Sequence, residues 1–196
     1  MSLKKLKKAF FQDREPKLQC SEEAIVTMEA CLKTFLLEVG RNLAQVLHLM
    51  KQSTVSPAVT LAYAEVGLHL TSSNLDKLKV LLETEPAKPE GKSRASLAMR
   101  YSLNIESPPV ISIVKAGMED YFPACAALRT SDKTNTGSYS TSPAARAALA
   151  WIAETVSTHF LEKAVLAAGK RGAKKIKGVD IECNWMNNFI HAQASL

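Results

Sequence analysis

Five cations gather in one short segment near the C-terminal end of the sequence, and they are the residues best suited to bind a ligand. They are Lys170, Arg171, Lys174, Lys175 and Lys177. A protein that neutralises several phosphates with such side chains gains affinity from the counterions it releases. Most cation runs are solvated segments, but this one separates two apolar helical patterns. That position predicts a loop that presents a compact basic patch.

The other residue types that carry chemistry show no pattern of a reactive site. The sequence has no C-x-x-C pair, glycine-rich phosphate loop, Ser-His-Asp order or paired carboxylates, and its histidines lack metal-ligand spacing. An enzyme is therefore the least favoured class, and we expect no metal and no cofactor. Scattered cysteines make a disulfide framework unfavourable and indicate a reducing intracellular compartment. The residues concerned are His48, His69, His159, His191, Cys20, Cys31, Cys125 and Cys183.

The composition is that of a basic chain with enough apolar residues to form a hydrophobic core. Its 196 residues are 46% hydrophobic, and 25 Lys+Arg against 19 Asp+Glu give a net charge of +6. Residues 91–196 carry 13 Lys+Arg and 8 Asp+Glu, so most of the excess lies in the second half. This balance favours an acidic partner. No apolar run approaches the about 20 residues of a membrane span, and residues 1–11 make a poor signal peptide.

The periodicity is almost wholly helical and repeats once. In the first half, apolar residues three and four apart predict one long helix from Ser21 to Met50, in which Gly40 indicates close packing. Ser56-Pro57 then opens a helix to Leu70, and a shorter one follows over 73–82. The best linker is 83–93, which contains Pro86, Pro89 and Gly91.

The second half follows the same plan. A short helix is predicted over 109–122, then a long polar loop over 128–141. Ser142-Pro143 opens a long helix that ends near Lys170, and a last helix is predicted over 178–190. Each half is thus predicted as short helix, loop, long helix, loop, short helix. Such an internal repeat is stronger evidence for the fold than any single residue.

Particular residues at this spacing resemble two core histones. The pattern Leu32-Lys33-x-Phe35-Leu36-x-x-Val39-x-Arg41, with Met50-Lys51-x-x-Thr54-Val55 after it, resembles the long helix and second loop of histone H-four. In the second half, Pro109-x-x-x-Ile113-Val114-Lys115-x-x-x-x-Asp120-Tyr121 resembles the first helix of histone H-three. Ala148-Leu149, Glu154, Glu162, Ile176 and Asp180-Ile181 continue it at the same spacing. These motifs cover about two thirds of the chain.

The resemblance implies an all-α fold class with two tandem histone folds packed as an intramolecular head-to-tail pair. Each first loop would lie beside the second loop of the other fold. The implied domains are 1–82, H-four-like; 83–106, linker and preceding helix; and 107–196, H-three-like with a long first loop. Fused doublets of this kind occur in large DNA viruses, so the resemblance also implies a viral source, and a virion, viral factory or host nucleus as the location.

Histones bind double-stranded DNA without a reaction, and the resemblance implies contacts through cations and helix N-termini at the loops. The residues implied are Lys4, Lys5, Lys7 and Lys8 at the first helix; Lys51 and Thr54 in the next loop; and Arg171, Lys174, Lys175 and Lys177, which should lie beside Arg14 and Lys17. A second copy of the chain would pack on the H-three-like end through Ala167, Lys170, Asp180, Cys183 and Met186. A partner doublet of the other two histone classes is implied as well, and no membrane.

Three departures from the family stand out. The lysine-rich tails are missing. The arginine of each first loop is missing too, near Lys17 or Gln19 in one half and near Tyr139-Ser140 in the other. The usual arginine–aspartate clamp is incomplete, because the position expected for the arginine partner of Asp180 holds Ala173, with Arg171 or Lys174 as the nearest substitutes; Val59 takes the aspartate position in the first half.

Two functions therefore compete at the level of sequence. The favoured one is an architectural doublet that compacts DNA in nucleosome-like particles. The alternative is a histone-fold interaction module of a transcription or chromatin complex that binds little DNA. A variant that replaces the ordinary doublet in a minority of particles fits the same losses.

Overall fold

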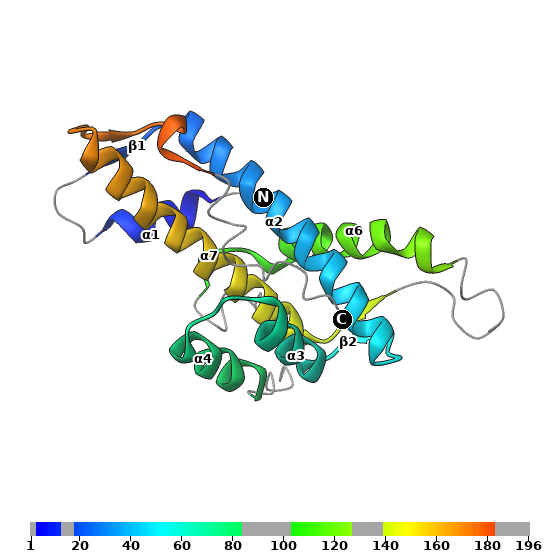
Figure 1. Ribbon diagram of the computed structural model, residues 1–196. Helices are drawn as coiled ribbons and strands as arrows, with labels where there is room; N and C mark the ends of the chain where they lie inside the picture. Colours follow the sequence, from blue (N-terminus) through cyan, green and yellow to red (C-terminus); the bar gives the residue numbers. More distant parts are fainter. Residues whose placement is uncertain (1–2, 13–17, 84–102, 127–138, 183–196) are drawn as a thin grey trace, which may run out of the picture.

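The computed structural model describes residues 3–12, 18–83, 103–126 and 139–182. The first half consists of α1 (Lys4–Gln12), β1 (Gln19–Cys20), α2 (Glu22–Leu49), β2 (Thr54–Val55), α3 (Pro57–Gly67) and α4 (Ser72–Glu83). The second half consists of α6 (Ser107–Ala126), β3 (Ser140–Thr141), α7 (Pro143–Lys170), β4 (Lys175–Ile176) and the 3-10 turn η1 (Gly178–Asp180) (Figure 1). The predicted short–long–short order is thus present in both halves, although the last helix predicted over 178–190 is described only as far as the 3-10 turn and Glu182.

Local signals fix both long helices at the same positions of the repeat. Ser21 and Ser142 are the N-caps, and their hydroxyls accept hydrogen bonds from the Ala24 and Ala145 amides at 3.1 and 3.2 Å. Each long helix spans 28 residues. After each helix the chain turns through a residue with positive φ, Lys51 at 53° and Gly172 at 65°. The two halves thus turn in the same way after their long helices, and each turn is followed by a short strand, β2 in the first half and β4 in the second.

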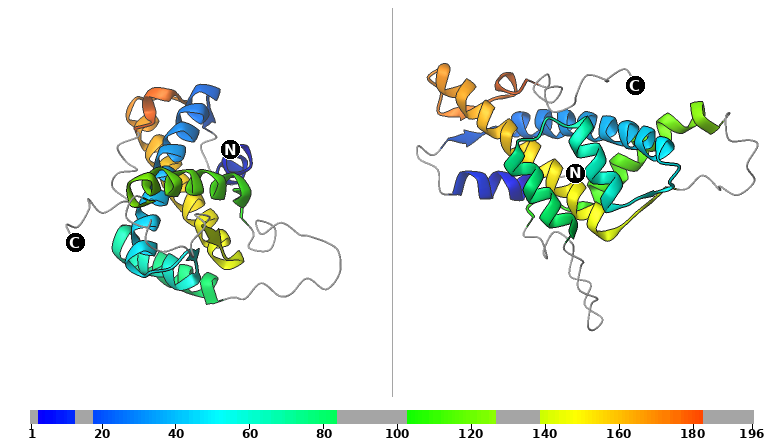
Figure 2. Two further views of the ribbon diagram at one scale, coloured as in Figure 1. Left: turned by 90° about the vertical axis from the view of Figure 1, so that its right-hand side faces the viewer. Right: turned by 60° about the horizontal axis from the view of Figure 1, so that its bottom comes forward.

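Two short parallel strand pairs join the halves head to tail. β1 pairs with β4, with Gln19 opposite Lys175, and β2 pairs with β3, with Thr54 opposite Ser140. The start of α2 therefore lies beside the end of α7, and the start of α7 lies beside the end of α2. The two helices run in opposite directions and cross each other, and the strand pairs lie at opposite ends of the structure (Figures 1 and 2).

One core serves both halves. Leu32, Leu36 and Leu43 of α2 are completely buried, as are Leu149, Ile152 and Phe160 of α7, and all belong to a single apolar cluster. α4 packs against α7 although it belongs to the first half (Figure 2). No helix in the described ranges is both long and apolar enough to cross a membrane.

α6 crosses α2 at a pair of glycines. A Cβ on Gly40 would lie 2.1 Å from the carbonyl oxygen of Val114, and one on Gly117 would lie 2.1 Å from that of Leu37. Both obstacles are backbone atoms, which cannot rotate away. The close packing predicted at Gly40 is therefore confirmed, with Gly117 as its counterpart on α6.

Several boundaries differ from the sequence predictions. α6 begins at Ser107 and continues to Ala126, beyond the predicted 109–122. α3 ends at Gly67 rather than Leu70, because Leu68 is extended and buried and directs the chain toward α4. The linker 84–102 and the loop 127–138 lie outside the described residues, so the domain boundaries stay a prediction. Cys31 is disulfide-bonded, and the prediction of unpaired cysteines is wrong for this residue.

The glycine crossing gives a direct test of the packing. Gly40→Ala should lower the free energy of unfolding by about 1–3 kcal/mol, because the added methyl group forces two helix backbones apart. Gly169→Ala is the matched control: no atom lies within 4 Å of the place that its methyl group would take, so alanine should leave stability unchanged or raise it by up to about 1 kcal/mol. Chemical denaturation of both variants checks this, and equal midpoints for the two would contradict the close crossing.

Candidate nucleic-acid interface

The first edge, defined by the β1/β4 pair, carries exposed lysines on both sides of a buried isoleucine. Extended residues alternate in direction. Ile176 is therefore buried in the core while Lys175 and Lys177 are exposed, and Lys174 is exposed as well. The Gln19 amide donates to the Lys174 carbonyl at 3.1 Å and the Ser21 amide to the Ile176 carbonyl at 2.9 Å. These three lysines form no ion pair with any residue that the structure describes.

Arg171 has a different role from its lysine neighbours. Its Nε donates to Oδ1 of Asp180 at 2.9 Å and its Nη2 donates to Oδ2, which forms a bidentate pair. The backbone amide of Lys177 also donates to Asp180, at 2.7 Å. The hydrogen bond from Arg171, followed by that from Lys177, holds the pKa of Asp180 below its usual value. This pair closes the second loop onto η1.

The clamp of the second half is therefore complete, and its arginine is Arg171, one of the two substitutes that the sequence offered for Ala173. Ala173 has no group that could bind Asp180. The long side chain of Arg171, two positions earlier, brings a guanidinium to this carboxylate instead. Asp180 is buried and paired within its own chain. Its partner Arg171 belongs to the same copy, so Asp180 is not left free to form an ion pair with a second copy of the chain. Arg171 is 38% exposed, so the outer side of its guanidinium still faces solvent.

The α1 lysines divide between two places. Lys7 and Lys8 line a hollow of about 500 Å³ with Leu18, Gln19 and Cys20, so this end of α1 adjoins the first edge. Burial raises the pKa of the Cys20 thiol, against an opposing effect of the nearby Lys7 ammonium. At the other end of α1, the Nζ of Lys5 lies 3.4 Å from a carboxylate oxygen of Glu106, and Lys4 is exposed. Arg14 and Lys17 lie outside the described residues.

The second edge, defined by the β2/β3 pair, is rich in hydroxyls and poor in cations. Thr54 Oγ1 and Ser140 Oγ lie 2.7 Å apart, and Lys51 is exposed in the loop before β2. α3 and α7 both begin here, each with proline in its first turn and neither with an acidic residue there. By contrast, α2 begins at the first edge with Glu22 and Glu23. The positive ends of two helix dipoles are thus unneutralised by local carboxylates at the second edge.

Arg146 is a cation of the second edge that the sequence analysis missed. It lies in the first turn of α7, is exposed, and its Nε donates to both the carbonyl and the Oγ1 of Thr141, at 3.1 and 3.0 Å. The sequence pattern indicates a loop arginine only near Tyr139-Ser140, where none is present. Helical geometry brings a residue in the first turn back beside the loop, and that signal could have found it.

The predicted oligomer surface is only partly described. Ala167 is half-buried, Lys170 is exposed and Asp180 is buried, while Cys183 and Met186 lie outside the described residues. The same end of the molecule exposes two large apolar side chains, Leu166 at 60% and Val179 at 75%. The sequence analysis did not include either of them.

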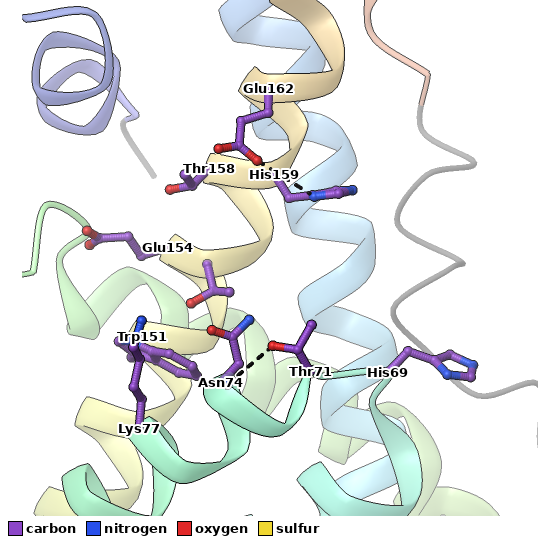
Figure 3. A pocket seen from close by; sticks show the side chains of 10 residues that line it. His69, Thr71, Asn74, Lys77, Trp151, Glu154, Thr158, His159 and Glu162 are labelled. Atoms are coloured by element: carbon purple, nitrogen blue, oxygen red, sulfur yellow. Dashed lines mark hydrogen bonds and ion pairs between the residues drawn. The ribbon is translucent and has the colours of Figure 1, made fainter. Parts of the chain in front are cut away.

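A polar groove of about 540 Å³ lies between α4 and α7, lined by residues that include His69, Asn74, Trp151 and His159 (Figure 3). Its Glu154 accepts hydrogen bonds from the amides of Asn104 and Ile105 at 2.6 and 3.2 Å, and so holds the segment before α6. Burial, followed by the charge of Lys163, lowers the pKa of His159. Among the described residues, no group of histidine, cysteine and carboxylate side chains could hold a metal ion.

Comparisons with known proteins bear on the fold. No protein-family model and no curated protein matches the sequence. The crystal structure of the histone from Methanopyrus kandleri is similar over 89% of this chain and 87% of that chain, with a TM-score of 0.50 and 18% sequence identity. The match extends over both halves. With the two short–long–short units and their head-to-tail strand pairs, it shows that the chain consists of two histone folds packed as an intramolecular pair.

The Arg171–Asp180 clamp predicts a pH-dependent loss of stability. Asp180→Asn should lower the free energy of unfolding by about 2 kcal/mol at pH 7, because a buried charged hydrogen-bond acceptor is lost. The folded pKa is depressed, so the wild-type advantage is present above the usual value of 3.8 and disappears as the pH falls below it. Thermal unfolding of both proteins between pH 7 and pH 2 measures this.

Asp120→Asn provides the control for that experiment. Asp120 is 58% exposed and lies 3.4 Å from Arg41 on the surface, so its loss should cost less than about 1 kcal/mol. Equal losses for the two variants at pH 7 would contradict a structural clamp at Asp180.

Proposed function

We propose that the protein is an architectural DNA-binding histone doublet. The observation that carries this proposal is the first edge, where strand pairing holds Lys174, Lys175 and Lys177 exposed in one short loop beside β1. Three such cations on a fixed backbone suit the closely spaced phosphates of a duplex. Contacts of this kind position DNA without reading its sequence, which is what compaction requires.

The proposed cargo is viral double-stranded DNA in nucleosome-like particles, within a virion, viral factory or host nucleus. A doublet of the other two histone classes is the proposed partner. The resemblance of the two halves to histones H-four and H-three supports this assignment, since one chain then supplies two of the four core histone classes. We propose no catalytic role, and in the polar groove we assign Glu154 the structural role of holding the segment before α6.

The alternative of a protein-interaction module has its own support in the structure. Glu22 and Glu23 are exposed at the N-terminus of α2, at the same end as the lysines, and would repel phosphates. Leu166 and Val179 expose apolar surface suited to a protein partner. These features favour protein contacts near the first edge, in addition to or in place of DNA.

DNA binding is tested by replacing the lysines of the first edge. In the triple variant of Lys174, Lys175 and Lys177 to alanine, affinity for a duplex should fall at least tenfold at about 100 mM salt. The slope of log affinity against log salt should also shrink by about 0.9 for each phosphate that the protein no longer neutralises. Fluorescence anisotropy with a labelled duplex at several salt concentrations measures both quantities.

A matched triple variant controls for total charge. Lys33, Lys77 and Lys163 are exposed within α2, α4 and α7 rather than in the loops, so their replacement by alanine removes the same charge elsewhere. We expect a smaller change in the slope of log affinity against log salt for this variant than for the first-edge triple variant. Equal slopes for the two triples would show that binding is diffuse and would favour the interaction module.

A second copy of the chain is the proposed partner of the H-three-like end. Leu166→Glu should shift a dimer of doublets toward the 21.4 kDa monomer, because it replaces one of the two large apolar side chains that this end exposes with a charged one. Val26→Glu, an equally exposed substitution on α2, should leave self-association unchanged. Light scattering at high salt and tens of micromolar protein reports the mass, and a wild-type protein that is monomeric under these conditions would rule out the dimer.

A further inference from the structure

Cys31 is a buried residue of α2 that is also covalently bonded. It is 2% exposed and lies in the shared apolar core with Met28, Leu32 and Phe35. Its sulfur takes part in a disulfide. The equivalent position of the repeat, ten residues after the N-cap serine of each long helix, holds the fully buried Ile152 in α7. An apolar side chain thus suffices for packing at this position, and the sulfur of Cys31 adds a bond that packing does not need.

The disulfide of Cys31 joins the two halves of the chain. The first half contains one other cysteine, Cys20, and that thiol is free. The two remaining cysteines of the sequence, Cys125 and Cys183, both belong to the second half. Their side chains lie outside the described part of the structure, so the partner is identified by elimination as one of these two. With either partner, the bond ties α2 to the histone fold of the second half.

A bond at this place adds a second covalent connection to a pair that is otherwise joined only by the chain between α4 and α6. It closes a loop that consists of residues 31–125 or 31–183. A cross-link that closes a loop of about 100 residues or more strongly restricts the unfolded chain, and so stabilises the folded state. It also limits how far α2 can move from the second half when the shared core opens.

The fold itself does not require the bond. A free buried cysteine packs as a small apolar residue. The strand pairs at both edges and the glycine crossing of α2 and α6 hold the halves together without it. Exchange with a dithiol breaks the S–S bond, leaves two protein thiols and converts the dithiol to its own disulfide. The chain can therefore exist in a cross-linked and an open form that share one fold.

We propose that the disulfide of Cys31 is a redox-dependent cross-link between the two histone folds. It is closed in oxidising surroundings and is opened by the dithiols of a reducing compartment. The two folds separate less readily in the cross-linked form than in the open form. This role needs no nucleic acid, so the inference goes beyond the proposed function and does not depend on it.

Thermal unfolding of the full chain with and without dithiothreitol tests the effect on stability. Reduction should lower the unfolding temperature of the wild-type protein by about 10 °C, and reoxidation should restore it. Cys31→Ala cannot form the bond, so its unfolding temperature should not respond to the dithiol. Cys20→Ala is the matched control, because it removes the free thiol, and it should respond as the wild type does. Equal unfolding temperatures for the oxidised and the reduced wild type would overturn the proposal.

A cleavage experiment tests whether the bond joins the halves. A protease site is inserted in the predicted linker 83–93, and the cleaved protein is run on denaturing gels. The two halves should migrate as one species without dithiothreitol and as two species with it. Mass spectrometry of the unreduced digest should show the Cys31 peptide linked to that of Cys125 or Cys183. Separation of the halves without reductant, or a link from Cys31 to Cys20, would contradict the cross-link.

Discussion

The apolar faces of α2 and α7 are the constraint on which the rest of the structure depends. Each long helix spans 28 residues and buries apolar side chains along most of its length, α2 mainly along one face and α7 on several sides, and the short helices of one half alone cannot cover this surface. The two helices therefore bury their apolar residues in one shared core, from Leu32 and Leu36 on one side to Ile152 and Phe160 on the other. Because both partners belong to one chain, this association does not depend on protein concentration.

The candidate DNA surface follows from that packing. Antiparallel long helices bring the loop after one beside the loop before the other, and the β1/β4 and β2/β3 pairs fix this arrangement. Each edge thus combines one loop from each half. The excess charge of the second half gathers at the first edge through Lys174, Lys175 and Lys177, while the second edge has hydroxyls and two exposed cations, Lys51 and Arg146. The two edges therefore differ in chemistry although they are equivalent in topology.

Sequence alone predicts the helices well where local signals are strong. Ser21 and Ser142 begin both long helices, because a serine hydroxyl caps the free amides and proline or carboxylates in the first turn reinforce it. The head-to-tail arrangement also followed, from the repeat and from the histone resemblance. Gly40 was identified as a close contact, but its partner Gly117 was not, since the crossing of α2 and α6 depends on tertiary packing.

The details of the site were harder to predict, because they depend on side-chain reach. The spacing of the family's motif predicts the arginine of the clamp at position 173, which holds alanine. The long side chain of Arg171 instead reaches Asp180 from two positions earlier. Arg146 was missed because it lies in a helix rather than in the loop, and only the folded turn brings it to Thr141. The disulfide of Cys31 had no signal in the cysteine spacing. Contacts of this kind are set by the fold and leave little trace in the sequence pattern.

Nuclease digestion of the protein reconstituted on long DNA, with and without a partner histone dimer, tests the central claim most directly. An architectural doublet that binds DNA at both edges should protect a discrete length, and that length should increase when the partner dimer is added. A smear at every protein ratio, from a protein that circular dichroism shows to be folded and helical, would contradict DNA packaging and leave the histone-fold pair as a protein-interaction module.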